Sequence, residues 1–294
     1  MMQFPHPPAP QFAPEQSATV ASELRYEDLA QDGRIMPIAL PPTLSGLWRT
    51  TLVKHEGARN ALATGVMPIL TRLTLSTLDQ PIRVDRPIET HAGFELAHAR
   101  DGDGVTRLFL LIWSDVRGMA GRVGPRQADG ALVPAGRLFA EHTFTRPLAP
   151  PDQRRVTRFD VAGYPEIPEA RYEFPAPTSA GALPANARWL DDLAPDPTPI
   201  VFTLDQTDSN QHVNSLVYIR VFLDAAQRRL ATAGERMTVR SRAVDIAYRK
   251  PCFAGDRVHS QVRLFDAGGL PGAAGLVAGD DGKPRCYVRV LFGT

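Results

Sequence analysis

The stretch from Asp208 to Asn214 reads Asp-Ser-Asn-Gln-His-Val-Asn and places three chemically useful residue types at close spacing. Asp208 supplies a carboxylate, Asn210 an amide and His212 an imidazole. A carboxylate can act as a general base or nucleophile, an amide can orient a polar group, and an imidazole can transfer a proton. At this spacing the three side chains can converge on one small ligand group.

A helix is predicted to begin where this stretch ends, and Val201 to Leu204 indicates a strand that leads into it. Val213, Asn214 and Ser215 then lie at the helix N-terminus. Free N–H groups and the positive end of the helix dipole favour a developing negative oxygen there. Hydrolysis of a thioester needs such an arrangement, because it requires a polarised carbonyl, a stabilised oxyanion and an activated nucleophile.

The same residue types are also typical of a purely structural loop. Asp, Ser and Asn are preferred N-cap and turn residues, so capping alone explains an Asp-x-Asn loop before a helix. A histidine beside a helix start is commonly a structural residue. The spacing therefore leaves capping and chemistry both open.

The predicted helix after the loop is apolar on nearly every side. Its main face is formed by residues at three- and four-residue steps: Leu216, Ile219, Leu223, Ala226 and Leu230. Because so little polar surface remains, we expect a sheet to wrap around it. Gly234 is the predicted stop.

A weak internal repeat indicates how that sheet is organised. The segments 73–87 and 243–257 align without gaps at an offset of 170, which superimposes Pro81 and Pro251. Each predicts a strand, a break and a second strand, and each follows a helical pattern, which in the first half covers roughly 44–65. We therefore predict an α+β fold of two similar halves, each a long helix cradled by a curved antiparallel sheet.

The repeat also divides the chain into four parts. Residues 1–20 are rich in proline and predict a disordered tail, and residues 21–146 form the first half. Residues 147–199 are a Pro-rich linker with a short element near Trp189, and residues 200–294 form the second half.

Composition excludes several classes of protein. With 294 residues, 43% hydrophobic and 22% charged, the chain is ordinary for a folded domain pair, and its formal net charge of +1 argues against nucleic acid or an anionic membrane as partner. The apolar run from Leu108 to Trp113 is too short to span a bilayer, and the N-terminus does not read as a secretory signal, so we expect a cytoplasmic protein. Two cysteines and scattered histidines predict neither a disulfide framework nor a metal, and no cofactor is expected.

The chain resembles the acyl-acyl-carrier-protein thioesterases, whose signature reads D-x-N-x-H-V-N-N-x-x-Y-I. Seven positions match it: Asp208, Asn210, His212, Val213, Asn214, Tyr218 and Ile219. The segment 247–252, Ala-Tyr-Arg-Lys-Pro-Cys, is similar to the family's Y-R-R-E-C. The resemblance implies two tandem hotdog folds with the active site in the C-terminal half. The first half offers only Asp32-Gly-Arg34 in place of the motif, so it is expected to be degenerate and to shape the acyl pocket.

The resemblance also implies roles within the site. Asp208 is the expected general base or nucleophile, Asn210 orients the attacking water or the thioester, and His212 positions the carbonyl or assists proton transfer. The oxyanion is expected at the N–H groups of Val213, Asn214 and Ser215.

Further residues are expected around this site. Tyr218 and Cys252 are expected to support it, although Cys252 also reads as a small apolar filler on a strand. Arg249 and Lys250 are candidates for the phosphates of a carrier arm, or else a solvated strand end. The substrate is expected to be an acyl thioester of CoA or of acyl carrier protein, and the chain a monomer or a homodimer.

Two departures from the family keep rival interpretations open. Ser215 replaces the second Asn of H-V-N-N, and Pro251 replaces the Glu before the Cys. Pro251 also fits the Y-x-x-P-x-x-x-G-D pattern of simpler hotdog thioesterases. One alternative is a hotdog hydratase or dehydratase, but its D-x-N-P-x-H spacing would need a histidine one residue later than His212 and a proline after Asn210. Another is a protein that binds acyl thioesters without catalysis.

Overall fold

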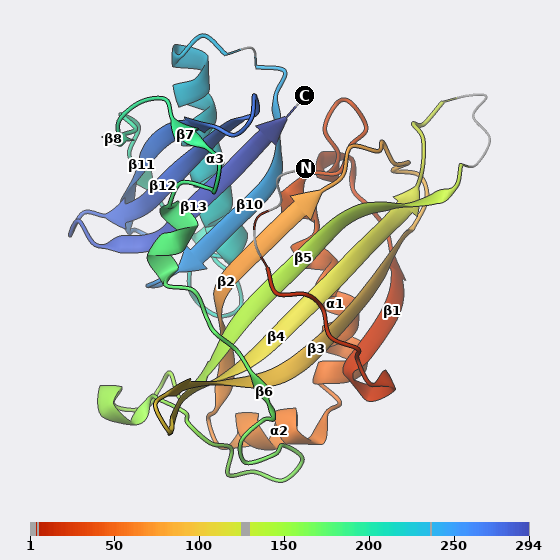
Figure 1. The fold of residues 1–294 in the computed structure, drawn as a ribbon, viewed down its shortest axis with the longest axis vertical. Helices are drawn as coiled ribbons and strands as arrows, with labels where there is room; N and C mark the ends of the chain where they lie inside the picture. The colour runs from red at the N-terminus through yellow and green to blue at the C-terminus, as the bar shows by residue number, and fades with distance from the viewer. Residues whose placement is uncertain (1–3, 5, 125–129, 236, 294) are drawn as a thin grey trace.

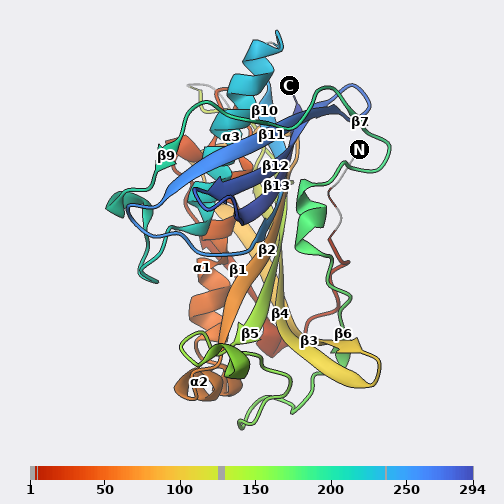
Figure 2. The ribbon, with the colours of Figure 1, turned by 90° about the vertical axis from the view of Figure 1, so that its left-hand side faces the viewer.

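The computed structural model describes residues 4, 6–124, 130–235 and 237–293. Within them, thirteen strands form one mainly antiparallel sheet. The larger helices lie against one face of this sheet, whereas the N-terminal segment and the middle of the linker, residues 170–189, run over the other face (Figures 1 and 2). None of the helices in the described ranges is both long enough and apolar enough to cross a bilayer.

The first half is a sheet of order β1-β3-β4-β5-β2 around a helical segment that is broken into short pieces. Its strands are β1 (Ser17–Ser22), β2 (Met67–Thr77), β3 (Ile88–Asp101), β4 (Gly104–Met119) and β5 (Leu132–Thr145). Its helical pieces are η1 (Pro14–Gln16), η2 (Tyr26–Asp28), η3 (Pro37–Ala39), η4 (Pro41–Leu44), α1 (Ser45–Leu47), η5 (Trp48–Leu52) and α2 (Glu56–Ala63).

The helix predicted over roughly 44–65 is present in place but is not continuous. The turn Trp48–Leu52 is π-helical, and His55 has an extended backbone that separates it from α2. Gly46 lets the helix approach β1 closely, because a Cβ atom there would lie 2.7 Å from Val20. The helical pattern in the sequence indicates the buried face but not these interruptions.

The second half repeats the arrangement around one regular helix. Its elements are α3 (Ser215–Thr232), β10 (Arg240–Tyr248), β11 (Arg257–Asp266), β12 (Pro271–Gly279) and β13 (Pro284–Gly293). Gly234 follows α3 with a φ of 85°, so the predicted stop is confirmed. The linker holds the short elements η6 (Pro151–Gln153), β6 (Ala170–Arg171), η7 (Pro177–Gly181), β7 (Arg188–Trp189), β8 (Ala194–Pro195), β9 (Ile200–Val201) and η8 (Leu204–Gln206). The element expected near Trp189 is β7, but the strand expected over 201–204 ends at Val201.

The two halves join through β2 and β10, and the register of this pair follows the repeat. Leu73 pairs with Ile246 and Ser76 with Ala243. At an offset of 170, Leu73 corresponds to Ala243 and Ser76 to Ile246, so the pairing maps onto itself when the halves are exchanged. Helices α1 and α3 begin at Ser45 and Ser215, which obey the same offset. The repeat is therefore a structural one, with the halves related by an approximate twofold axis.

This offset corrects the expected place of the lost motif. The equivalent of 208–214 in the first half is 38–44, which reads Ile-Ala-Leu-Pro-Pro-Thr-Leu, rather than Asp32-Gly-Arg34. The segment is apolar and carries none of the three candidate side chains. The first half therefore has no second copy of the site.

The main hydrophobic core fills the space between the sheet and the helices, and smaller clusters lie on the outer face. The structure differs there from the expected disordered tail. Phe4 is buried, the Phe12 ring lies 5.9 Å from that of Trp113, and the Trp113 indole donates to the Pro7 carbonyl at 2.8 Å. Strand β1 also begins at Ser17, inside the predicted tail. Apolar side chains on the outer strands need this cover.

A buried ion network crosses the outer face where the halves meet. The Asp245 carboxylate on β10 accepts from Arg72 on β2 at 2.9 and 2.7 Å and from Arg289 on β13 at 2.9 Å. Asp245 is fully buried, and Arg72 also donates to the Ser179 hydroxyl of the linker. Charge therefore ties both halves and the linker together.

Candidate functional site

The predicted motif forms a tight turn between η8 and α3. The Asp208 N–H donates to the His212 carbonyl at 3.1 Å, and the Gln211 N–H donates to the Asp208 carbonyl at 2.9 Å. Gln211 has a φ of 65°, in the left-handed region, which lets the chain reverse within so few residues. The turn presents its side chains beside the start of α3.

The Asp208 carboxylate holds the turn and the helix cap together. One oxygen accepts from the Asn210 backbone N–H at 2.9 Å, and the other accepts from the Asn214 side-chain amide at 3.1 Å. Asn214 in turn caps α3, because its side-chain oxygen accepts from the Leu216 N–H at 2.9 Å. The predicted capping role is therefore present, and the carboxylate remains at the helix N-terminus.

His212 is half-buried and bonds only locally. Its Nδ1 lies 3.2 Å from the Val213 carbonyl, which can only accept, so Nδ1 carries the proton in this contact. In a neutral ring this leaves Nε2 as an acceptor. Asp208, Asn210 and His212 thus border one turn, but among the described residues no side-chain hydrogen bond joins His212 to either of the other two.

The three backbone N–H groups predicted for the oxyanion are not equivalent. The Val213 N–H donates to the Cys252 carbonyl at 2.8 Å, and the Asn214 N–H donates to the Gln206 carbonyl at 2.9 Å. The Ser215 N–H has no acceptor in the described part of the chain. The structure therefore narrows the oxyanion candidate from three residues to Ser215.

Tyr218 and Cys252 form a chain of hydrogen bonds that ends at Val213 of the turn. The Cys252 N–H donates to the Tyr218 hydroxyl at 2.7 Å, while its carbonyl holds Val213. Burial, and then the contact with Cys252, raises the pKa of Tyr218. Cys252 itself is fully buried, and burial raises the pKa of its thiol, so it does not have the environment of a nucleophile.

Sequence reasoning gave no role to Tyr248, which the structure places at the same point. Its hydroxyl donates to the Ser215 carbonyl at 3.0 Å, and its ring meets that of Tyr218 edge-on at 6.0 Å. Burial raises the pKa of Tyr248. Its inward position in the alternating strand 244–248 is the signal that could have indicated this contact.

Arg249, Lys250 and Pro251 lie exposed between β10 and Cys252. The backbone N–H groups of Arg249 and Lys250 donate to the Arg285 carbonyl at 2.8 and 3.3 Å, and no ion pair engages either side chain within the described ranges. Pro251 leaves no carboxylate at the place of the family's glutamate. Asp256, the next acid along the loop, accepts from the Phe253 N–H at 2.9 Å.

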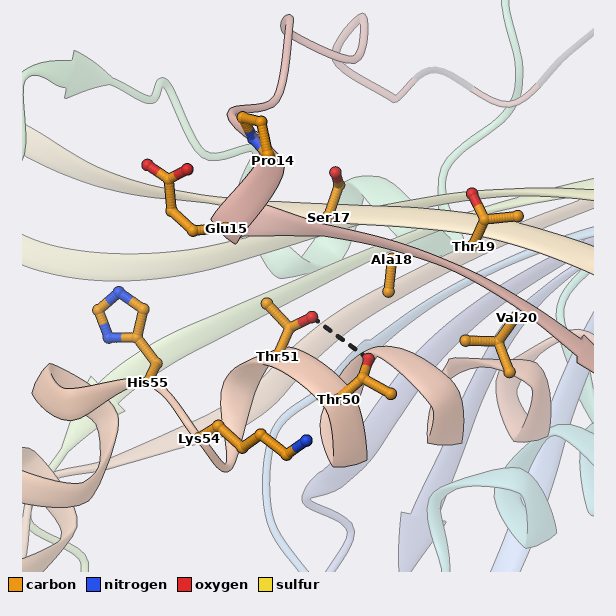
Figure 3. A pocket seen from close by; sticks show the side chains of 10 residues that line it. All are labelled: Pro14, Glu15, Ser17, Ala18, Thr19, Val20, Thr50, Thr51, Lys54 and His55. Carbon is orange, nitrogen blue, oxygen red and sulfur yellow. Dashed lines mark hydrogen bonds between the residues drawn. The ribbon is translucent and has the colours of Figure 1, made fainter.

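Two hollows open elsewhere on the surface, and none of the motif residues lines them. One, of about 460 Å³, lies between β1 and the helical segment that carries Thr50, Thr51, Lys54 and His55 (Figure 3). The other, of about 430 Å³, lies beside the loop that follows Cys252. Its lining is strongly charged: Val201, Gly255, Asp256, Arg257, Asp280, Asp281 and Arg285. Among the described residues, no group of three or more His, Cys, Asp and Glu side chains could hold a metal ion.

Solved structures with the same fold cover almost the whole chain. The chain is similar to an acyl-ACP thioesterase from Bacteroides thetaiotaomicron, with a TM-score of 0.60 and 16% identity over 94% of this chain and 98% of that one. It is similar to the 12:0-ACP thioesterase from Umbellularia californica, with a TM-score of 0.55 and 13% identity over 94% of this chain and 97% of that one. It is also similar to a protein from Lactobacillus plantarum assigned as an oleoyl thioesterase, with a TM-score of 0.59 and 16% identity over 97% of this chain and 98% of that one.

No family model and no curated protein sequence matches this chain. At such low identities the likeness to solved structures establishes the fold. Coverage of nearly the full length of each chain confirms two tandem hotdog halves.

Proposed function

We propose that this chain hydrolyses an acyl thioester, carried by CoA or by acyl carrier protein, to a free carboxylic acid. The observation that carries the proposal is the Asp208 carboxylate at the N-terminus of α3, next to the Ser215 N–H, which has no acceptor among the described residues, in a chain with the fold of two acyl-ACP thioesterases. A base and an oxyanion donor thus occur together. The first half, which lacks the motif, supplies the wall for the acyl chain.

Each group has a role in this reaction. Asp208 takes a proton from a water molecule, whose oxygen then bonds to the thioester carbon. The carbonyl oxygen becomes an oxyanion at the Ser215 N–H, where the α3 dipole favours negative charge. When the carbon–sulfur bond breaks, the thiolate recovers the proton. The free Nε2 of His212 suits proton transfer better than donation to the carbonyl, and Asn210 orients the water.

Replacing Asp208 tests the proposal directly. Asp208→Asn keeps the shape and one of the two oxygens that accept from the Asn210 N–H and the Asn214 amide, but it removes the base, so we expect turnover at least ~100-fold lower. The assay follows thiol release from acyl-CoA and acyl-carrier-protein thioesters of graded chain length. Asp205→Asn is the matched control, because it makes the same charge change at an exposed residue of η8. Equal turnover by Asp208→Asn and the unmodified chain would exclude this role.

A further inference from the structure

Three buried polar atoms on the inner wall of the first half have no hydrogen-bond partner in the part of the chain that the structure describes. They are the Thr90 and Ser114 hydroxyl oxygens and His142 Nδ1, on side chains that are 2%, 3% and 8% exposed. A buried polar atom without a partner destabilises a fold, because it has lost its hydrogen bonds to water without replacement. The Ser260 hydroxyl, which corresponds to Thr90 at the offset of 170, has no partner among the described residues either, and Ser114 pairs with Leu138, four residues along β5 from His142. Each of these atoms therefore needs its own explanation.

His142 is the most informative of the three. It lies on β5 between Ala140 and Phe144, which both belong to the main core, so its ring points toward the helical segment. Trp48 covers the ring edge-on, with centroids 6.0 Å apart. Burial lowers the pKa of His142 to about 4 and outweighs the backbone groups of Leu110 and Ala140, whose contact with the ring raises it. The ring is therefore neutral at pH 7 and offers one donor and one acceptor.

A second buried histidine on the sheet of the first half does have a partner for its Nδ1, whereas the Nδ1 of His55, in the helical segment, has none among the described residues. His98 on β3 is also 8% exposed, yet its Nδ1 lies 2.8 Å from the Pro168 carbonyl. The fold satisfies that histidine from the linker. It supplies no such partner for His142 Nδ1 among the described residues.

His142 also lies in line with the candidate site. It pairs with Leu70 of β2, and two residues further along β2, Arg72 pairs with Ala247, the neighbour of Tyr248. Two strand spacings separate β10 from β5, so His142 lies roughly 10 Å across the sheet from Tyr248, which holds the start of α3. Leu70 and Tyr248 are only partly buried against the core. This row of side chains leads from the start of α3 into the first half.

Trp48, which covers the His142 ring, lies at a distinctive point of the first-half helical segment. It corresponds to Tyr218 at the offset of 170 and begins the π-helical turn Trp48–Leu52. Single π-helical turns occur frequently at functional sites. Trp48 is itself only partly buried, so part of its side chain reaches the surface.

We propose that His142 is a specificity-determining residue that hydrogen-bonds an oxygen atom on the acyl chain, so that the preferred substrates are thioesters with a hydroxyl or keto group within the chain. This inference rests on the proposed hydrolysis and names its substrate class. A chain of methylenes would leave His142 Nδ1 unsatisfied, whereas a chain oxygen would pair with it.

The test compares plain acyl-CoA thioesters with analogues of the same length that carry one hydroxyl or keto oxygen at successive carbons. We expect kcat/KM for one position of the oxygen to exceed that of the plain chain by roughly tenfold or more. His142→Phe keeps an aromatic ring against Trp48 and should bring this ratio close to one, mainly by lowering kcat/KM for the oxygenated chain. His98→Phe is the matched control and should leave the ratio unchanged.

Two results would overturn the inference: an unmodified chain with no preference at any position, or a His142→Phe variant that keeps the preference. Binding of the corresponding free acids, measured by calorimetry, separates this failure from that of the proposed function. If no thioester is hydrolysed, the proposed function fails. His142 must then still favour the oxygenated acid in binding, and equal affinities would reject its role.

Discussion

At the N-terminus of α3, the two carboxylate oxygens of Asp208 accept hydrogen bonds from different groups. One closes the turn through the Asn210 N–H, and the other holds the N-cap residue Asn214. The motif could be predicted from residue types, since an Asp-x-Asn loop before a helix is typical of both capping and chemistry. The sequence could not predict that the Val213 and Asn214 N–H groups are already hydrogen-bonded within the protein, because their acceptors, Cys252 and Gln206, are fixed by tertiary contacts.

His142 gives a prediction at this scale that does not depend on any substrate. Burial lowers its pKa to about 4 from the ordinary value of 6.5. Between these values the unfolded chain binds a proton that the folded chain does not, so stability falls as the pH drops from 6.5 toward 4. The full effect corresponds to about 3 kcal/mol.

The variant His142→Phe removes this contribution. Its free energy of unfolding should therefore fall less steeply between pH 6.5 and 4 than that of the unmodified chain. Urea denaturation at a series of pH values measures the difference, and other titrating groups such as His55 and Glu141 contribute to both proteins alike. Parallel curves would show that His142 is not held neutral.

Among the elements, the two central helices differ although they hold equivalent places. Helix α3 runs without interruption, as its three- and four-residue spacing predicts, whereas the first-half segment changes to a π-helical turn at Trp48 and restarts after His55. Local spacing identifies the buried face in both cases. The first-half segment also packs closely against β1 at Gly46, a contact that a single segment of sequence does not reveal.

The link between α3 and the loop at Cys252 yields an element-scale prediction. Tyr218→Phe removes the acceptor of the buried Cys252 N–H, so we expect the free energy of unfolding to fall by about 1–3 kcal/mol. Turnover should fall as well, because Cys252 also holds Val213 in the turn. Tyr287→Phe is the control, since that hydroxyl bonds nothing in the described part of the chain. Equal stability of the two variants would argue against the link.

At the scale of the whole molecule, the internal repeat at an offset of 170 predicted the architecture well, although the two aligned segments share few identical residues. It anticipated two equivalent halves, and the β2–β10 register obeys it. It gave no sign that the tail and linker cover the outer face, because that cover follows from apolar and charged side chains on different strands. Asp245, Arg72 and Arg289 become one network only when β2, β10 and β13 lie side by side.

That network predicts how strongly the halves depend on each other. Asp245→Asn leaves two buried guanidinium groups facing a neutral amide, and breaking a buried ion pair from one side costs about 3–5 kcal/mol. The midpoint of chemical denaturation should fall accordingly. Asp115→Asn breaks an exposed pair with Arg137, where both side chains are more than half exposed, and should change stability by less than about 1 kcal/mol. Because Asp245 joins β10 to β2, the loss should be shared by both halves, seen as one transition in fluorescence from Trp48 and Trp189. If only the second half unfolded earlier, the network would stabilise β10 and β13 without coupling the halves.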